Sequence, residues 1–293
     1  MITFATQKDD LTRIAAGVAT RLAARIASRA ALAVVAVSTS MFMSQPVSAA
    51  PPATEAYTGL LARYVVASPD GVNRVDYARW HANAADRKAL DAVIADHAKA
   101  TPSKLVRNEQ FAYWANLYNA ITLKVILDNY PVKSIRDIKS AGVWLDPKAF
   151  TGPWVAKRVT VEGKELSLEE IEHSIMRETF KDPRVHYSVN CASFGCPNLP
   201  PKAFAAATLE ADLDAGARAF VNNPRGATIK PDGTLQVSSI YHWFKVDFGG
   251  TDAGVIDHLK KYAEPPLRAK LDGIKAVGGH AYDWSLNDIT KTK

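Results

Sequence analysis

The segment RVHYSVNCASFGCP, residues 184–197, contains both cysteines of the chain and one of its seven histidines. A cysteine close to a histidine can act as a nucleophile whose proton the imidazole removes. Two cysteines five positions apart can instead form a disulfide or supply half of a metal site. Since these chemistries exclude one another, the rest of the sequence has to favour one of them.

In the nucleophile interpretation, His186 is the base and Cys191 the attacking thiol, with Cys196 as the other candidate thiol. Asn116 or Asn119 would orient the imidazole, as the third group of a catalytic triad does. Papain-like and transglutaminase-like enzymes similarly combine a buried helix with a later histidine strand, but there the helix carries the thiol. This loose architectural similarity is an analogy and does not transfer a mechanism.

In the second interpretation, Cys191 and Cys196 form a disulfide. Two cysteines in a short loop are a natural pair in an oxidising compartment, and Gly195 can supply an unusual dihedral for a small ring. Together with His173 and His186 the cysteines also offer zinc-binding side chains, but their spacing matches no common zinc motif. We therefore predict no metal and no cofactor, and two inert thiols stay as a further alternative.

The element that positions these residues is a predicted helix over 108–130. Asn108 can cap its N-terminus and Pro131 ends the pattern. The segment is apolar nearly all round, which indicates a buried helix. Its exceptions, Glu109, Asn116 and Asn119, are spaced to share one stripe.

The residues before the first cysteine alternate in polarity, and the pattern predicts a strand over 184–190. Arg184, His186, Ser188 and Asn190 would then share one face, opposite the side chain of Cys191. If this face meets the polar stripe of the buried helix, the two form a polar site inside an apolar domain. The alternative is a structural network whose hydrogen bonds are all satisfied.

The remaining patterns predict a mixture of helices and short strands. They comprise a strand over 155–161 with a turn at Glu162–Gly163, a helix capped by Ser167 and Glu170, a helix over 209–221, a hairpin around 231–233 and a last helix over 254–263. No repeat or second linker interrupts them. We predict a single α+β domain over 51–293, in which the buried helix packs on a small, mainly antiparallel sheet.

Residues 1–50 differ from the rest of the chain. Arginines precede the short apolar run AALAVVAVSTSMFM, and VSA follows it, with cleavage expected after Ala49 or Ala50. This pattern is typical of a secretory signal with a long basic region. We therefore expect a periplasmic or secreted protein with no stable membrane span after signal removal, although a retained anchor or a transit peptide is an alternative.

Removal of residues 1–50 takes away 5 of 36 basic and 2 of 30 acidic residues, leaving 31 against 28, a net charge of +3. A nucleic-acid-binding surface needs clustered Lys and Arg interleaved with aromatic residues, and the sequence has no such cluster. Nucleic acid is therefore not an expected partner.

Four motifs in order resemble the family known as domain of unknown function 547. They are EQFAYWANLYNAITLKVILDNYPVKSI, GKELSLEEIEHSIMR, DPRVHYSVNCASFGCPNLP and YHWFKVDF, and they span about 110–248. The residues that match the family pattern are Asn116, Asn119, Glu172, His173, Arg184, His186, Asn190, Cys191, Cys196 and Pro197. The resemblance implies no activity, because the function of the family is not established.

Two hypotheses follow. In the first, the chain is a hydrolase or acyl-transfer enzyme acting on a small-molecule or peptide-like substrate. His186 is then the base and Cys191 the nucleophile; the orienting or binding residues are Asn116, Asn119, His173, Arg184 and Asn190. In the second, the chain is a disulfide-stiffened module that binds an envelope protein without turnover.

Overall fold

Helix α4 (Arg107–Asn129) is the long buried helix that the sequence predicts. It begins one residue earlier than expected, because the carboxylate of Glu109 accepts a hydrogen bond from the main-chain N–H of Val106 at 3.2 Å. Glu109 therefore caps the first turn, and Asn108 lies inside the helix rather than before it. Tyr130 ends the helix in an extended conformation, as expected of the residue before Pro131.

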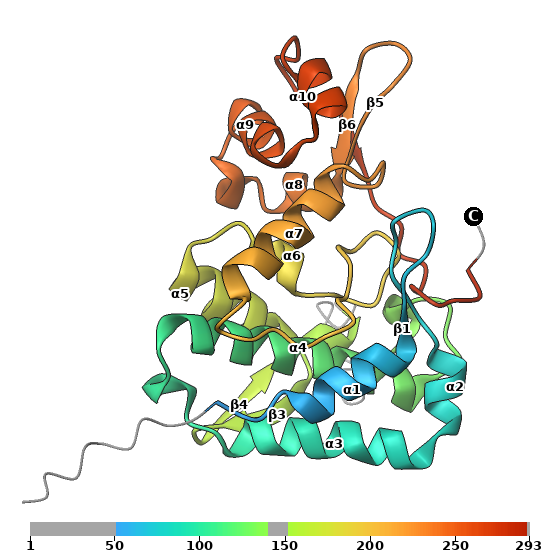
Figure 1. The fold of residues 1–293 in the computed structure, drawn as a ribbon, viewed down its shortest axis with the longest axis vertical. Helices are drawn as coiled ribbons and strands as arrows, with labels where there is room; N and C mark the ends of the chain where they lie inside the picture. The colour runs from blue at the N-terminus through green and yellow to red at the C-terminus, as the bar shows by residue number, and fades with distance from the viewer. Residues whose placement is uncertain (1–50, 140–151, 292–293) are drawn as a thin grey trace, which may run out of the picture. The chain divides into compact units, whose positions relative to one another are not determined.

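The computed structural model describes residues 51–139 and 152–291 (Figure 1). The predicted signal, residues 1–50, lies outside the described residues. No helix of the described ranges is both long enough and apolar enough to cross a membrane.

Other helices surround α4. Helices α2 (Tyr77–Ala82) and α3 (Ala84–Lys99) pack on it directly, and α1 (Glu55–Tyr64) packs on α3 (Figure 1). A short 3-10 helix, η1 (Pro102–Lys104), and the π-helix η4 (Glu170–Arg177) also contact α4, and a second 3-10 helix, η2, covers Ile135–Asp137. Together with Val161 and Leu166 these elements form the first hydrophobic core.

The strands form three small sheets rather than one. Strands β1 (Val65–Val66) and β2 (Arg74–Val75) pair, as do β3 (Lys157–Val161) and β4 (Lys164–Ser167), both antiparallel. The third sheet has the order β5 (Ala227–Ile229), β6 (Leu235–Ser238) and β7 (Gly279–Ala281), with β6 and β7 parallel. The predicted turns at Glu162–Gly163 and 231–233 both join antiparallel strands.

A second hydrophobic core is formed by the C-terminal elements. Its helices are α7 (Leu209–Val221), α8 (Ser239–Trp243), the 3-10 helix η5 (Lys245–Phe248), α9 (Asp252–Tyr262) and α10 (Pro265–Leu271). The predicted α+β class with a central buried helix is thus confirmed, although α4 packs mainly against helices.

The predicted strand over 184–190 is wrong. Residues Val185–Ser188 form a helical turn, α6, just after the short helix α5 (Glu178–Phe180). Asp182 starts the turn, since its carboxylate accepts the main-chain N–H of Arg184 at 2.8 Å and its carbonyl accepts that of Val185 at 3.0 Å. All four residues of α6 are buried, so their alternating polarity does not mark a buried and an exposed face.

Candidate functional site

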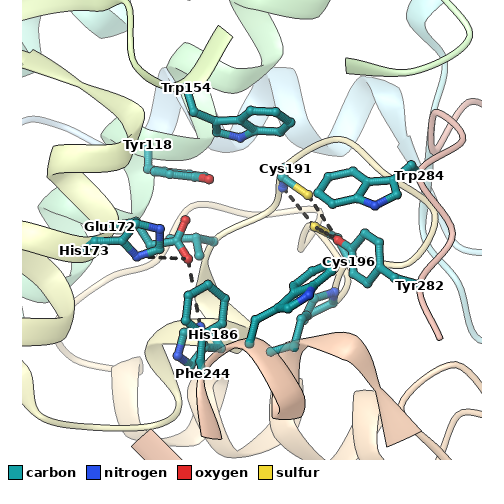
Figure 2. Close-up of a pocket in the computed structure, with 14 residues that line it drawn as sticks. Tyr118, Trp154, Glu172, His173, His186, Cys191, Cys196, Phe244, Tyr282 and Trp284 are labelled. Carbon is teal, nitrogen blue, oxygen red and sulfur yellow. Dashed lines mark hydrogen bonds and ion pairs between the residues drawn. The ribbon is translucent and has the colours of Figure 1, made fainter. Parts of the chain in front are cut away.

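A cavity of about 200 Å³ opens where the two hydrophobic cores meet. Segments distant in sequence supply its walls, so tertiary folding is needed to assemble it (Figure 2). Its lining residues are Tyr118, Trp154, Glu172, His173, His186, Val189, Cys191, Cys196, Pro197, Ile240, Trp243, Phe244, Tyr282 and Trp284.

One wall carries a histidine whose orientation is fixed. His186 Nε2 lies 2.7 Å from Asp247 Oδ2, and the imidazole stacks on Phe244 with ring centroids 4.5 Å apart. Arg177 donates two hydrogen bonds to the same carboxylate, at 2.6 and 3.0 Å. Because an ionised carboxylate only accepts, Nε2 carries a proton, and in the neutral ring Nδ1 keeps its lone pair.

Asp247 is held in its ionised form. Burial alone would raise the pKa of this carboxyl group, but the hydrogen bonds from His186 and Arg177, and their charges, bring its pKa well below the ordinary value. The carboxylate therefore fixes the imidazole and stabilises the positive charge that forms when Nδ1 accepts a proton.

The π-helix η4 adds Glu172 and His173 to the same wall. Consecutive residues are separated by a smaller angle in a π-helix than in an α-helix, so both neighbours line the cavity. Glu172 Oε1 lies 3.9 Å from Nδ1 of His173 and 3.9 Å from Nδ1 of His186 (Figure 2). Within the described ranges, no group of three His, Cys, Asp or Glu side chains is arranged to hold a metal ion.

The cysteine loop forms the facing wall, and buried amides fix its shape. Asn119 donates to the carbonyl of Ser188 and accepts the N–H of Asn190, both at 2.8 Å. Asn190 in turn donates to the carbonyl of Pro197 at 2.7 Å and accepts the N–H of Ala192 at 2.8 Å. These bonds close the loop on itself, so the role of Asn119 and Asn190 is to shape the cavity wall.

The loop is also paired with the segment 282–287. Gly195 donates its N–H to the carbonyl of Asp283 at 2.8 Å, and a Cβ atom on Gly195 would lie 2.8 Å from the nitrogen of Asp283. Glycine is thus required at position 195 because two segments of the chain approach closely there. It is not required for a left-handed backbone, since the residue of the loop with positive φ is Ala192, at 61°. This approach brings Tyr282 and Trp284 to the cavity.

Cys191 and Cys196 carry free thiols in this structure. Cys196 Sγ accepts the N–H of Cys191 at 3.0 Å, the hydroxyl of Tyr282 at 3.1 Å and the hydroxyl of Ser193 at 3.7 Å. Burial opposes ionisation of Cys196, yet hydrogen bonds from Cys191, Tyr282 and Ser193 lower its pKa to about 7. Burial and the neighbouring Cys196 sulfur raise the pKa of Cys191 well above its usual value.

The hydrogen bonds to Cys196 therefore make it the more acidic thiol, whereas the sequence predicts Cys191 as the nucleophile. In the described residues, no hydrogen bond joins His186 to either sulfur (Figure 2). The direct thiol–imidazole pair is not formed in this conformation. The proximity of the two sulfurs is compatible with the predicted disulfide, which stays a prediction.

Asn119 and Asn190 shape the cavity wall without lining the cavity, and two further sequence-predicted site residues lie away from it. Asn116 bonds both the N–H and the carbonyl of Phe204, at 2.9 Å each, and lines a separate cavity with Glu109. Arg184 pairs with Asp182 at 2.7 Å, and with Glu210 and Asp214 of α7. The predicted meeting of two polar faces is therefore wrong for these residues, because the turn at α6 separates Arg184 from His186.

Several residues that complete the site have no predicted role. Glu172 was noted only as a family match, and Trp243, Phe244 and Asp247 lie within the quoted motif YHWFKVDF. The pair Tyr282 and Trp284 had a signal as well, two aromatic residues in an otherwise polar C-terminal segment. Trp154 had no comparable signal.

Residues 102–221 match the family model described as "Protein of unknown function, DUF547". The match supports the family resemblance and includes η4, α6 and the cysteine loop. Asp247, Tyr282 and Trp284 lie beyond the matched range. No curated protein and no solved structure matches the chain.

Proposed function

We propose that the chain is an enzyme that hydrolyses, or transfers the acyl group of, an ester or amide bound in this cavity. The observation that carries the proposal is the orientation of His186 by Asp247, with Nε2 at 2.7 Å from the carboxylate and Nδ1 on the side of Glu172. A general base needs a free lone pair next to bound substrate, and the position of His186 in the cavity wall meets that requirement.

In the proposed reaction, His186 Nδ1 removes a proton from the attacking water or hydroxyl group, which then adds to the substrate carbonyl. Asp247 stabilises the imidazolium, and the imidazolium returns the proton to the leaving group. Arg177 positions Asp247 through its two hydrogen bonds. Cys196, on the facing wall, is the thiol best suited to serve as an alternative nucleophile, because the hydrogen bonds that its sulfur accepts lower its pKa.

The proposal is tested with the full chain and a panel of aryl esters, thioesters and amides that carry neutral, anionic or cationic acyl groups. We expect hydrolysis of at least one compound, and a decrease in kcat/KM of about 10²–10⁴-fold in His186→Gln. His81→Gln is the matched control, since its ring bonds the carbonyl of Leu127 outside the cavity. Equal rates for wild type and His186→Gln across the panel would contradict the proposal.

A second readout needs no substrate. ¹⁵N NMR distinguishes the two imidazole tautomers, and the signal absent from His186→Gln should report a protonated Nε2 and an unprotonated Nδ1. A protonated Nδ1 in the neutral ring would remove the proposed base.

We further propose that the chain is exported to the periplasm or secreted, on the strength of the basic and apolar pattern in residues 1–50. Mass spectrometry of the chain recovered from the periplasm of a Gram-negative host tests this. A chain that keeps residues 1–50 and stays inside the cell would contradict it.

A further inference from the structure

The cavity is enclosed largely by aromatic rings. Figure 2 shows the rings of Tyr118, Trp154, Phe244, Tyr282 and Trp284 around the cavity, and Trp243 also lines it. The rings of Tyr282 and Trp284 lie 4.6 Å apart, and that of Trp243 lies 5.0 Å from Tyr282. Several aromatic rings around one small volume concentrate the negative potential of their faces, which attracts organic cations.

The charged side chain in the lining is negative, like the potential at the faces of the aromatic rings. Glu172 is the carboxylate among the described residues that line the cavity, and none of those residues is Lys or Arg. Arg177 and Arg136 lie against Phe244 and Trp284, but neither is part of the lining. Arg177 is moreover committed to Asp247, so its charge is already balanced.

Glu172 is only 13% exposed and forms no ion pair with Lys or Arg within the described ranges, although the hydroxyl of Tyr118 and the more distant charge of Arg177 interact with it. Its ion-pair partners among the described residues are two histidine nitrogens at 3.9 Å, which are cationic only when protonated. Because no cation of the described part of the chain lies in direct contact with this largely buried carboxylate, a bound ammonium ion would add a favourable charge interaction.

We propose that the cavity binds an organic ammonium ion, with the cationic group between the aromatic rings and the carboxylate of Glu172. The apolar remainder of the ligand extends past Trp243, which is 45% exposed. An anion of the same size is repelled by Glu172, and a neutral isostere loses the electrostatic attraction. The inference deepens the proposed function, since it concerns the substrate class of the same cavity, but binding requires no turnover.

Isothermal titration calorimetry of the full, reduced chain at about pH 8, where a free imidazole is neutral, tests the proposal. The probes are choline and its uncharged isostere, in which carbon replaces the ammonium nitrogen. We expect choline to bind at least about tenfold more tightly than the isostere. Glu172→Gln should weaken choline binding about tenfold or more and leave binding of the isostere unchanged.

The matched control is Glu169→Gln, which removes an exposed carboxylate from the residue before the same π-helix. It should bind choline like the wild type. A second variant, Trp243→Leu, should weaken choline binding about 3- to 5-fold through loss of one ring at the mouth. It also keeps the test informative if Glu172→Gln does not fold.

Equal affinity for the two probes, no binding of choline, or unchanged binding in both variants would overturn the proposal. His186→Gln separates it from the proposed function, because this variant should lose turnover and still bind choline. Choline binding without any esterase or amidase activity would leave cation recognition standing and contradict only the catalysis.

Discussion

Asn119 and His186 are equally hidden from solvent, with exposed fractions of 2% and 3%, yet their surroundings differ in kind. The side-chain amide of Asn119 donates to the carbonyl of Ser188 and accepts the N–H of Asn190. In the imidazole of His186, Nε2 bonds Asp247, whereas Nδ1 lies 3.9 Å from Glu172 in the wall of a cavity. Burial alone does not mark a site, whereas an unused lone pair that faces a cavity does.

The largest effect in this comparison is expected for Asn119→Ala. The substitution removes two buried hydrogen bonds and leaves the carbonyl of Ser188 and the N–H of Asn190 unpaired. We expect the free energy of unfolding to fall by about 2–4 kcal/mol, since each unsatisfied buried group costs about 1–3 kcal/mol. Chemical denaturation of the full chain, followed by circular dichroism, measures the change.

Thr122→Val is the control on the same helix. The hydroxyl of Thr122 is buried and has no hydrogen-bond partner among the described residues, so an isosteric methyl group should leave stability unchanged or increase it. If Asn119→Ala lowered the free energy of unfolding no more than Thr122→Val does, the structural role assigned to the two hydrogen bonds of Asn119 would be contradicted.

The same distinction shows what the sequence could predict. Helix α4 and the two hairpins were found because their signals are local, an apolar segment ended by proline and glycine turns between alternating residues. The predicted strand over 184–190 was wrong because all four residues of α6 are buried. The alternation of polar and apolar residues there does not distinguish a buried face from an exposed one. Local pattern identifies elements best where one side meets water.

The site itself was only partly predictable. The sequence predicts His186, His173 and the cysteines as site residues, but the partner that orients His186 is 61 residues further along the chain. Tyr282 and Trp284 reach the cavity through main-chain pairing between 283–287 and the cysteine loop. Such pairings depend on tertiary contacts that no local spacing encodes.

The next effect concerns the cysteine wall, where hydrogen bonds again decide the chemistry. In the reduced protein, Cys196 should release its proton with a midpoint near pH 7, because three neighbouring groups donate to its sulfur. The thiolate absorbance in the far ultraviolet, recorded against pH, measures this midpoint. Cys196→Ser should abolish the transition, and Cys191→Ala should move it upward, because it removes the hydrogen bond from the Cys191 thiol while keeping that from the Cys191 main-chain N–H.

The sign of the stability effect follows from linkage. The folded pKa of Cys196 is below the 9.0 of a free thiol, so the unfolded chain binds more protons between these values. Stability of the reduced protein should therefore rise from about pH 7 to about pH 9 relative to Cys196→Ser, and the gain should vanish as pH falls through 7. Above pH 9 the raised pKa of Cys191 acts in the opposite direction. A single thiol transition near pH 9 would contradict the assignment of Cys196.

The smallest effect on stability is expected for Glu172, the carboxylate that lines the cavity. Its carboxylate forms no ion pair with Lys or Arg in the described ranges, and Arg177 acts on it only at longer range, so Glu172→Gln should change the free energy of unfolding by less than about 1 kcal/mol in either direction. Glu170→Gln, two residues earlier in η4, is the matched control. The Glu170 carboxylate bonds Lys157 and the N–H of Ser167, which lower its pKa to about 2, so its loss should cost on the order of 1 kcal/mol. A larger loss for Glu172 than for Glu170 in denaturation experiments would identify Glu172 as a structural residue. A carboxylate that serves a ligand should behave in this way: Glu172→Gln should leave the free energy of unfolding nearly unchanged and weaken choline binding.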